Sequence, residues 1–74
     1  MIYKLPFLSL KEMKYIHNIY GTLELDILQR TDGEFVVITT YEDIFIEGYG
    51  NTEREAIKMT FAKLRQQVKK IEYN

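Results

Sequence analysis

The chain of 74 residues contains no cysteine, one histidine and one serine. Without cysteine it has no disulfide, no thiol nucleophile and no cysteine-containing zinc site, and this composition fits a reducing compartment. His17 has no second histidine with which it could form a multi-histidine metal site. Ser9 is explained as a helix cap. We therefore expect no catalytic residue, no metal and no cofactor.

Long hydrophobic runs are also absent: none approaches the roughly 18 residues that a membrane-spanning helix needs. The apolar first ten residues are interrupted by Lys4 and Pro6, and they lack the small-residue cleavage site of a signal peptide. Hydrophobic residues make up 46% of the chain, which is enough to form a core. We therefore expect a single cytoplasmic domain over residues 1–74, without a membrane segment.

The most informative stretch predicts the passage from a strand into a long amphipathic helix. Gly48 and Gly50 allow a sharp exit from the strand. Thr52 and Glu55 form a Thr-x-x-Glu capping box, which satisfies free backbone donors at a helix start. The helix is expected from Glu53 to Ile71. Its apolar stripe should pack on a sheet and consists of Ile57, Phe61, Leu64, Val68 and Ile71, flanked by Ala56 and Thr60.

Upstream of this junction the sequence predicts a short helix and three strands. Ser9 and Glu12 fit a second capping box, and a helix is expected from about Leu10 to His17. Alternating, β-branched and aromatic residues predict strands over Thr22–Arg30, Glu34–Tyr41 and Ile44–Gly48. The predicted fold class is α+β in the order α-β-β-β-α. A three-stranded antiparallel sheet carries a short N-terminal helix and a long C-terminal helix packed on one face.

The Thr-Asp-Gly sequence between the first two predicted strands leaves the register of this hairpin open. A two-residue Asp-Gly turn pairs Ile27 with Ile38 and directs Val36 and Ile38 into the core. A three-residue loop directs Phe35 and Val37 there instead, since a shift of one residue reverses every side chain. We favour the two-residue turn.

Charge is unevenly distributed, although the net charge of the chain is only −1. Residues 22–53 hold eight acidic residues and one basic residue, whereas residues 54–70 hold six basic residues and one acidic residue. The predicted strands are therefore acidic and the predicted helix is basic. Such an asymmetry indicates interaction with a charged partner, and it is equally compatible with two solvated surfaces.

The face of the sheet that the helices leave open is expected to carry a binding surface. If Ile44 and Ile46 point inward, Phe45, Glu47 and Tyr49 point outward. They would share this face with Glu24, Asp26 and Leu28 of the first predicted strand and, if the hairpin has the two-residue turn, with Phe35, Val37 and Tyr41. A patch that mixes aromatic and acidic side chains suits a protein with a basic, partly apolar surface, a second copy of this chain included.

The order of the predicted elements resembles the double-stranded-RNA-binding domain over nearly the whole chain. That family begins its last helix with Gly-x-Gly-x-Ser-Lys-Lys-x-Ala-Lys-x-x-Ala-Ala, and Gly48, Gly50, Thr52 and Ala56 stand at the matching places. The resemblance implies binding of duplex RNA, which is recognised largely through its backbone.

The residues that hold RNA in that family are changed in this chain. Two phosphate-binding lysines are replaced by Glu53 and Arg54, and a later lysine is replaced by Ile57. Because an acidic helix start repels phosphate, nucleic acid is not the expected partner. RNA binding through the basic helix is kept as the alternative function. Its expected contacts are Lys58, Arg65 and Lys69.

Residues 22 to about 70 also resemble the HicB antitoxin domain. That family has an Asp-Gly-type hairpin and a Gly-x-Thr-x-x-Glu-Ala entry into a helix, which Gly50, Thr52, Glu55 and Ala56 match. Its usual Pro-Asp-Leu-Pro-Gly element is absent. The resemblance implies a small domain that neutralises a partner by binding it, and small phage inhibitors of nucleic-acid enzymes share this compact order by analogy of fold.

We therefore expect a non-catalytic protein-binding domain, antitoxin-like or a phage-type inhibitor. It would neutralise a basic partner such as a toxin or a nucleic-acid enzyme. The expected contact residues are Glu24, Asp26, Asp32, Glu34, Glu42, Asp43, Phe45, Glu47 and Tyr49. A homodimer through the open face or through the edge of the third predicted strand is the other expected assembly.

Overall fold

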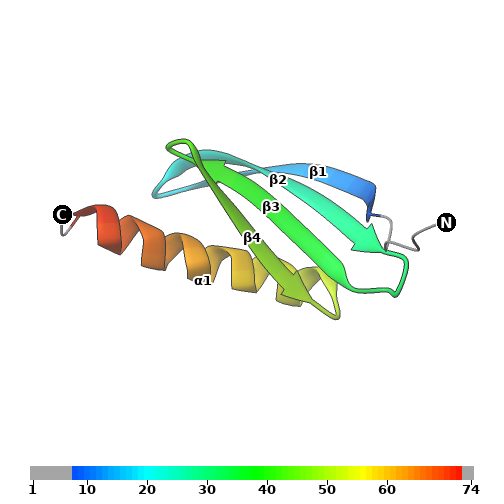
Figure 1. The fold of residues 1–74 in the computed structure, drawn as a ribbon. Helices are drawn as coiled ribbons and strands as arrows, with labels where there is room; N and C mark the ends of the chain where they lie inside the picture. Colours follow the sequence, from blue (N-terminus) through cyan, green and yellow to red (C-terminus); the bar gives the residue numbers. More distant parts are fainter. Residues whose placement is uncertain (1–7, 73–74) are drawn as a thin grey trace, which may run out of the picture.

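The structure, a computed structural model that describes residues 8–72, contains a four-stranded antiparallel sheet with one helix packed on one face (Figure 1). The strands lie side by side in chain order. The elements are β1 (Leu8–Asn18), β2 (Gly21–Arg30), β3 (Phe35–Tyr41), β4 (Ile44–Gly50) and α1 (Glu53–Glu72). The class is α+β, but the order is β-β-β-β-α rather than α-β-β-β-α.

The predicted N-terminal helix over residues 10–17 is wrong, and so is the three-stranded sheet, because this segment forms strand β1. Tyr15 lies opposite Glu24 and Ile16 lies opposite Leu23 in an antiparallel pairing with β2. The pairing supplies partners for backbone groups of β2 that would otherwise form an exposed sheet edge. Aromatic and β-branched residues such as Tyr15 and Ile16 also pack better on a pleated sheet than in a helix.

The β2–β3 hairpin adopts the register that we did not favour. Ile27 lies opposite Val37 rather than Ile38. Val37 is therefore in the core beneath the helix, together with the half-buried Phe35. Val36 and Ile38 point to the other face, because successive side chains alternate along a strand. The prediction of a two-residue turn is corrected to a three-residue loop.

Local hydrogen bonds explain this loop. The N–H of Gly33 donates to the Arg30 carbonyl at 2.9 Å, and the N–H of Arg30 donates to the Glu34 carbonyl at 2.8 Å. Gly33 has a φ of +98°, the left-handed conformation that closes a three-residue hairpin loop with a bulge. Asp32 adds a side-chain bond, because its Oδ1 accepts the N–H of Glu34 at 3.0 Å. These contacts stabilise the longer loop.

The β3–β4 hairpin has a two-residue turn, in which Glu42 and Asp43 have φ values of 51° and 67°. Positive φ at both central residues is the signature of a type I′ turn. The turn places Tyr41 opposite Ile44. The register directs Ile44 towards the core, and with it the buried Ile46, which is the condition under which Phe45, Glu47 and Tyr49 point outward.

Helix α1 begins with the capping box that the sequence predicted. The N–H of Glu55 donates to Thr52 Oγ1 at 3.1 Å, and the Glu55 carboxylate accepts the N–H of Asn51 at 3.2 Å. Glu53 and Glu55 place negative charge in the first turn, where it complements the helix dipole. The start of the helix is thus determined locally.

The core lies between α1 and the sheet. It is formed by Leu23, Leu25, Ile27, Val37 and Ile46 from the strands and by Ala56, Thr60 and Leu64 from the helix. The predicted apolar stripe is only partly correct. Leu64 is fully buried, whereas Ile57, Phe61 and Val68 are half-buried, because the helix turns its small residues, Ala56 and Thr60, directly towards the sheet. The side chain of Ile71 lies outside the described part of the chain.

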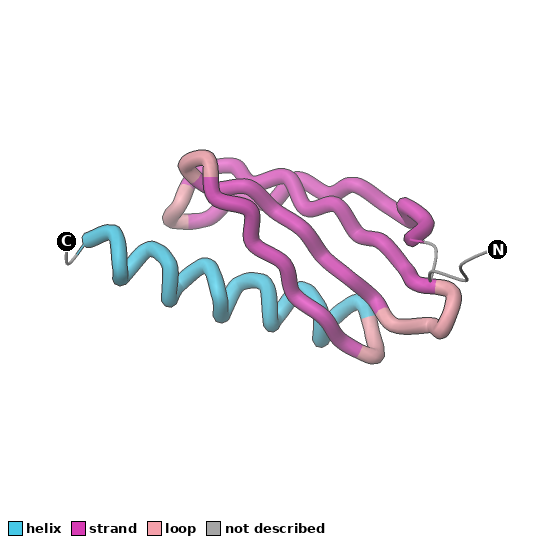
Figure 2. The backbone as a smooth tube through the Cα atoms, viewed as in Figure 1, coloured by secondary structure: helices cyan, strands magenta, loops and turns pink. Residues whose placement is uncertain are grey.

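The helix runs along the β3–β4 side of the sheet, where it packs against both strands (Figure 2). An ion pair joins β1 to its first turn, because Lys14 Nζ lies 3.0 Å from the Glu53 carboxylate. The hydrogen bond to Glu53, followed by the charge of Glu12, raises the pKa of Lys14. No helix among the described residues combines the length and the apolar composition that a membrane crossing requires.

Candidate functional site

The face of the sheet opposite α1 is covered by no helix of the described residues, and we call it the open face (Figure 1). It consists of the side chains that alternate along each strand with those of the core. Its members on β1 and β2 include Leu8, Leu10, Met13, Tyr15, Glu24, Asp26, Leu28 and Arg30. Its members on β3 and β4 are Val36, Ile38, Thr40, Phe45, Glu47 and Tyr49.

Large apolar and aromatic side chains are exposed at both edges of the open face, on β1 and on β4. Phe45 on β4 is 75% exposed and Tyr15 on β1 is 64% exposed. Further exposed members are Leu8, Leu10, Met13 and Tyr49. Monomeric proteins rarely leave apolar side chains gathered on one face without a binding role. The open face is therefore the candidate functional surface.

A hollow of about 240 Å³ on this face joins carboxylates to an aromatic ring. It is lined by Glu24 and Asp26 from β2, by Phe45 from β4 and by residues of β3 between them. The antiparallel order brings these side chains together from strands that are distant in the sequence. Two negative charges beside an exposed ring would fit a basic side chain with an apolar stem, such as lysine or arginine.

Asp26 has an unsatisfied carboxylate oxygen in the middle of the open face. Its Oδ1 is shielded from solvent and has no hydrogen-bond partner among the described residues. Met13 and Ile38 lie opposite Asp26 on the two neighbouring strands and offer it no donor. A shielded acceptor without a donor is costly, so a donor supplied by a bound molecule would be stabilising.

Two tyrosine–carboxylate pairs flank the hollow. The hydroxyl of Tyr15 donates to Glu24 at 3.1 Å, and the hydroxyl of Tyr49 donates to Glu47 at 2.5 Å. Each hydrogen bond raises the pKa of its phenol, because the carboxylate accepts the proton that would be lost. The pairs orient Glu24 and Glu47 while leaving both carboxylates at the surface.

Two of the predicted contact residues, Asp32 and Glu34, lie away from this hollow. They belong to the loop between β2 and β3, where Arg30 contacts both carboxylates at 3.4 Å and 3.1 Å respectively. One arginine balances only one of these two negative charges, so the pair contributes less than two free carboxylates to a surface that would attract a basic partner. Glu34 also lies near Tyr49, because its charge acts on this phenol together with that of Glu47.

The turn between β3 and β4 carries the two remaining predicted acids, Glu42 and Asp43. Both are exposed, and the turn directly precedes the first residues of β4, including Phe45. These charges therefore extend the acidic surface from the open face to the adjacent end of the sheet.

The three basic residues of the alternative prediction lie on α1 rather than on the open face. Lys58, Arg65 and Lys69 are exposed, and their spacing along the helix places them on one side of it. None of them forms an ion pair with a carboxylate of the described residues.

The contribution of β1 to the open face was missed at the sequence level. Met13 and Tyr15 lie on this face, and both are exposed. The signal was present as an alternation of Met13, Tyr15 and His17, which has the period of a strand. Helical spacing of Leu10, Met13 and His17 obscured it.

No family model, curated protein or solved structure matches this chain. The resemblances to the double-stranded-RNA-binding and HicB domains stay predictions. The functional inference therefore rests on the chemistry and the geometry of the surface.

Proposed function

We propose that this chain is a non-catalytic protein-binding domain that uses its open face to bind a basic, partly apolar surface of another protein. One observation carries the proposal: Glu24, Asp26 and Glu47 lie on the same exposed face as Phe45 and Tyr49, opposite the helix. The role that follows is antitoxin-like or inhibitory. Covering a basic surface of a toxin or a nucleic-acid enzyme would block the access of its substrate.

The two kinds of side chain would act on different steps of binding. Surface carboxylates attract a basic partner over distance and raise the association rate. An exposed aromatic ring such as Phe45 becomes buried in the complex and slows dissociation. A lysine or arginine that enters the hollow would place its donors beside the carboxylate of Asp26.

Photo-crosslinking can identify the partner and locate its position on the chain. The photoreactive analogue p-benzoylphenylalanine is placed at Phe45 and, as a control, at Arg65 on the exposed side of α1. We expect one protein to be captured from Phe45 and not from Arg65. The captured protein is then purified, and its affinity for the chain is measured by calorimetry.

A matched pair of charge reversals tests the face itself. Glu47→Lys and Glu12→Lys change the charge equally at exposed strand positions, but Glu12 lies on the face opposite Glu47. We expect Glu47→Lys to weaken binding of the purified partner about 30-fold, and Glu12→Lys to change it less than about threefold. Equal losses, or capture from Arg65 in place of Phe45, would contradict the proposal.

A further inference from the structure

Strand β4 forms a free edge of the sheet, because β3 is its neighbour on one side and no described strand lies on the other. The type I′ turn makes Tyr41 and Ile44 a hydrogen-bonded pair, and such pairs alternate with non-hydrogen-bonded pairs along an antiparallel ladder. The backbone groups of Phe45, Glu47 and Tyr49 therefore point away from β3. They form a row of donors and acceptors along the edge.

The two edges of the sheet differ in how they are protected. On β1 the register shifts between Leu10 and Glu12, a bulge that interrupts the regular spacing of backbone groups. Lys11 and Lys14 add charge to the same edge. Bulges and lysines are the devices by which proteins prevent another strand from pairing. Strand β4 contains no bulge, no proline and no lysine, so its edge is the one suited to pairing.

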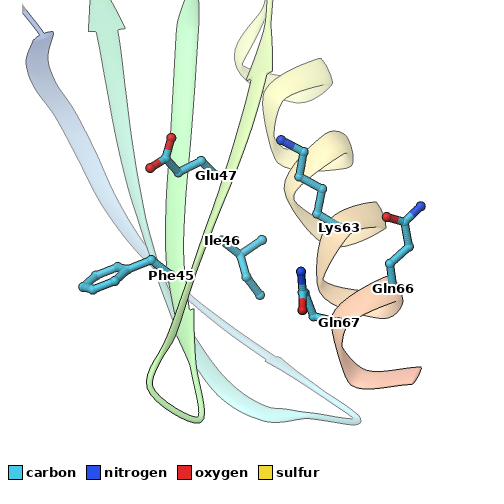
Figure 3. A pocket seen from close by; sticks show the side chains of 6 residues that line it. All are labelled: Phe45, Ile46, Glu47, Lys63, Gln66 and Gln67. Atoms are coloured by element: carbon cyan, nitrogen blue, oxygen red, sulfur yellow. The ribbon is translucent and has the colours of Figure 1, made fainter. Parts of the chain in front are cut away.

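A groove of about 400 Å³ runs along this edge (Figure 3). Phe45 and Glu47 point to one side of β4 and Ile46 points to the other, and the groove contacts all three. A hollow that touches both sides of a strand must follow its edge. The opposite wall is the second half of α1, which contributes Lys63, Gln66 and Gln67.

Lys63 gives the groove wall a positive charge that is not paired with a carboxylate of the described residues. Its Nζ lies 5.5 Å from the centre of the Tyr49 ring, and it forms no ion pair within the described residues. On the open-face side of the edge stands the carboxylate of Glu47. The groove therefore has a cation contributed by the helix wall, which reaches towards Tyr49, and an anion on the open-face side of the edge.

We propose that β4 binds an extended segment of a partner protein, which adds to the sheet as a fifth strand between β4 and α1. The added strand has a lysine or arginine opposite Glu47 and an aspartate or glutamate on the next residue, directed towards Lys63. Adjacent residues of a strand point to opposite faces, so this order matches the charges of the groove. The backbone supplies the main contacts, as in other strand-addition complexes, and the site does not rest on the open-face proposal.

A second copy of the chain fits this edge less well. Strand β4 contains one charged residue, Glu47, and no basic residue. Pairing of two β4 strands would offer no cation to Glu47. It would also offer no carboxylate to Lys63, because Glu47 points to the open face rather than towards the helix.

Two synthetic peptides of equal composition test the charge order. In Thr-Val-Lys-Glu-Val-Thr the charges fall on opposite faces of a strand, and in Thr-Lys-Val-Glu-Val-Thr they fall on the same face. Both are acetylated, amidated and titrated into the isotope-labelled protein. We expect the first peptide to bind at least about fivefold more tightly than the second, since two charge contacts form together only in the first.

Amide hydrogen exchange, read by nuclear magnetic resonance, locates the peptide. We expect saturation with the first peptide to slow exchange of the Phe45 and Glu47 amides about tenfold or more. The amides of Ile46 and Gly48 already bond to β3, so their exchange should not change. Equal affinity for both peptides, no saturable binding, or protection of the β1 edge instead would overturn the proposal.

Substitutions at Glu47 separate the backbone from the side chain. Glu47→Pro removes an edge donor without removing a bond to β3, whereas Glu47→Ala removes only the carboxylate. We expect about threefold weaker peptide binding for Glu47→Ala and no detectable binding for Glu47→Pro. A loss that is the same for both variants would assign binding to the carboxylate and overturn the edge site. Should Glu47→Pro fail to fold, the exchange pattern of the unsubstituted protein decides.

Light scattering provides the last discriminating measurement. We expect a monomer before peptide is added, with fast exchange at Phe45 and Glu47. A dimer in which these two amides are already protected would show that a second copy occupies the edge, and it would overturn the proposal. Phe45 lines both the groove and the open-face hollow, so the peptide and exchange experiments, and not the Phe45 crosslink, decide the edge site. A negative result in them leaves the open-face proposal to its own tests.

Discussion

Gly48 of β4 lies directly against Thr60 of the helix. A methyl group added at Gly48 would overlap both the hydroxyl and the backbone nitrogen of Thr60. Thr60 is fully buried, and its hydroxyl lies 3.0 Å from the Val37 carbonyl and 2.9 Å from the Ala56 carbonyl. Its single proton serves one of them at a time. The helix therefore approaches the sheet closely enough that a side chain has no room.

The substitution Gly48→Ala should destabilise the protein by about 3 kcal/mol, because backbone atoms rather than a flexible side chain oppose the new methyl group. Gly33→Ala is the matched control. A methyl group there meets open space, and the cost of about 1 kcal/mol comes from the φ of +98°. Urea unfolding followed by circular dichroism measures both. A smaller loss for Gly48→Ala than for Gly33→Ala would contradict the close approach.

The capping box yields a second prediction. Replacing Thr52 by alanine removes the acceptor of the Glu55 N–H and should lower the free energy of unfolding by about 1 kcal/mol. Thr52→Ser keeps the acceptor and should leave the stability nearly unchanged. The measurement is again urea unfolding, with helix content read from circular dichroism. If the serine and alanine variants lose the same amount, the hydroxyl does not cap the helix.

The capping-box motif correctly predicted a helix after Thr52 and wrongly predicted one after Ser9, and the difference has a physical reason. After Thr52 an apolar stripe continues over the whole length of a 20-residue helix, which provides a face to bury. After Ser9 the helical spacing spans only residues 10–17, and the same segment also alternates as a strand. Isolated short helices are marginal. Pairing with β2 therefore decided the outcome, and local sequence carries no information on that pairing.

The predicted register of the hairpin between β2 and β3 was wrong by one residue. An Asp-Gly pair fits both the centre of a two-residue turn and the end of a three-residue loop with glycine in the left-handed conformation. The side chain of Asp32, which caps the N–H of Glu34, favours the longer loop. A register error of one residue exchanges the two faces of a strand. Phe35 and Val37 therefore lie on the core face, where Val36 and Ile38 had been predicted.

The acidic, aromatic part of the candidate site was foreseeable because β4 alternates regularly. Its sequence directs Phe45, Glu47 and Tyr49 to one face whatever the first hairpin does, and the structure places them there. The pairing of Asp32 and Glu34 with Arg30 was not foreseeable, because it depends on the loop geometry. Charge counts along a sequence do not distinguish paired from unpaired carboxylates.

The two tyrosine–carboxylate pairs make a third prediction, on pH dependence. Hydrogen bonds to Glu24 and Glu47 raise the pKa of Tyr15 and Tyr49, so the folded protein holds these phenol protons more tightly than the unfolded chain. The resulting stability is fully present below the ordinary tyrosine pKa of about 10. It is lost as the pH rises through the raised pKa.

The comparison is between the unsubstituted protein and the double variant Tyr15→Phe/Tyr49→Phe. Between about pH 9 and pH 11 the free energy of unfolding should decrease more steeply in the unsubstituted protein, because only it loses the two hydrogen bonds. Urea unfolding at a series of pH values gives the two slopes. Parallel slopes would show that neither phenol donates to its carboxylate in solution.

The fourth prediction concerns the binding of duplex RNA by the basic side of α1. Lys58, Arg65 and Lys69 are exposed and could approach phosphates. However, Glu53 and Glu55 occupy the first turn of the helix, where an RNA-binding version of this junction would carry positive charge. Negative charge at this end repels the phosphate backbone.

We therefore expect a flat anisotropy titration of labelled duplex RNA, even at low salt, because three lysine or arginine contacts next to two carboxylates provide little net attraction. The control is a Glu53→Lys/Glu55→Lys variant, which should bind measurably if the carboxylates are what prevents binding. Saturable binding by the unsubstituted protein, with a salt slope of about −2 to −3 as expected for three phosphate contacts, would favour RNA as the partner. Loss of that binding in a Lys58→Glu/Arg65→Glu/Lys69→Glu variant would assign it to the helix rather than to the open face.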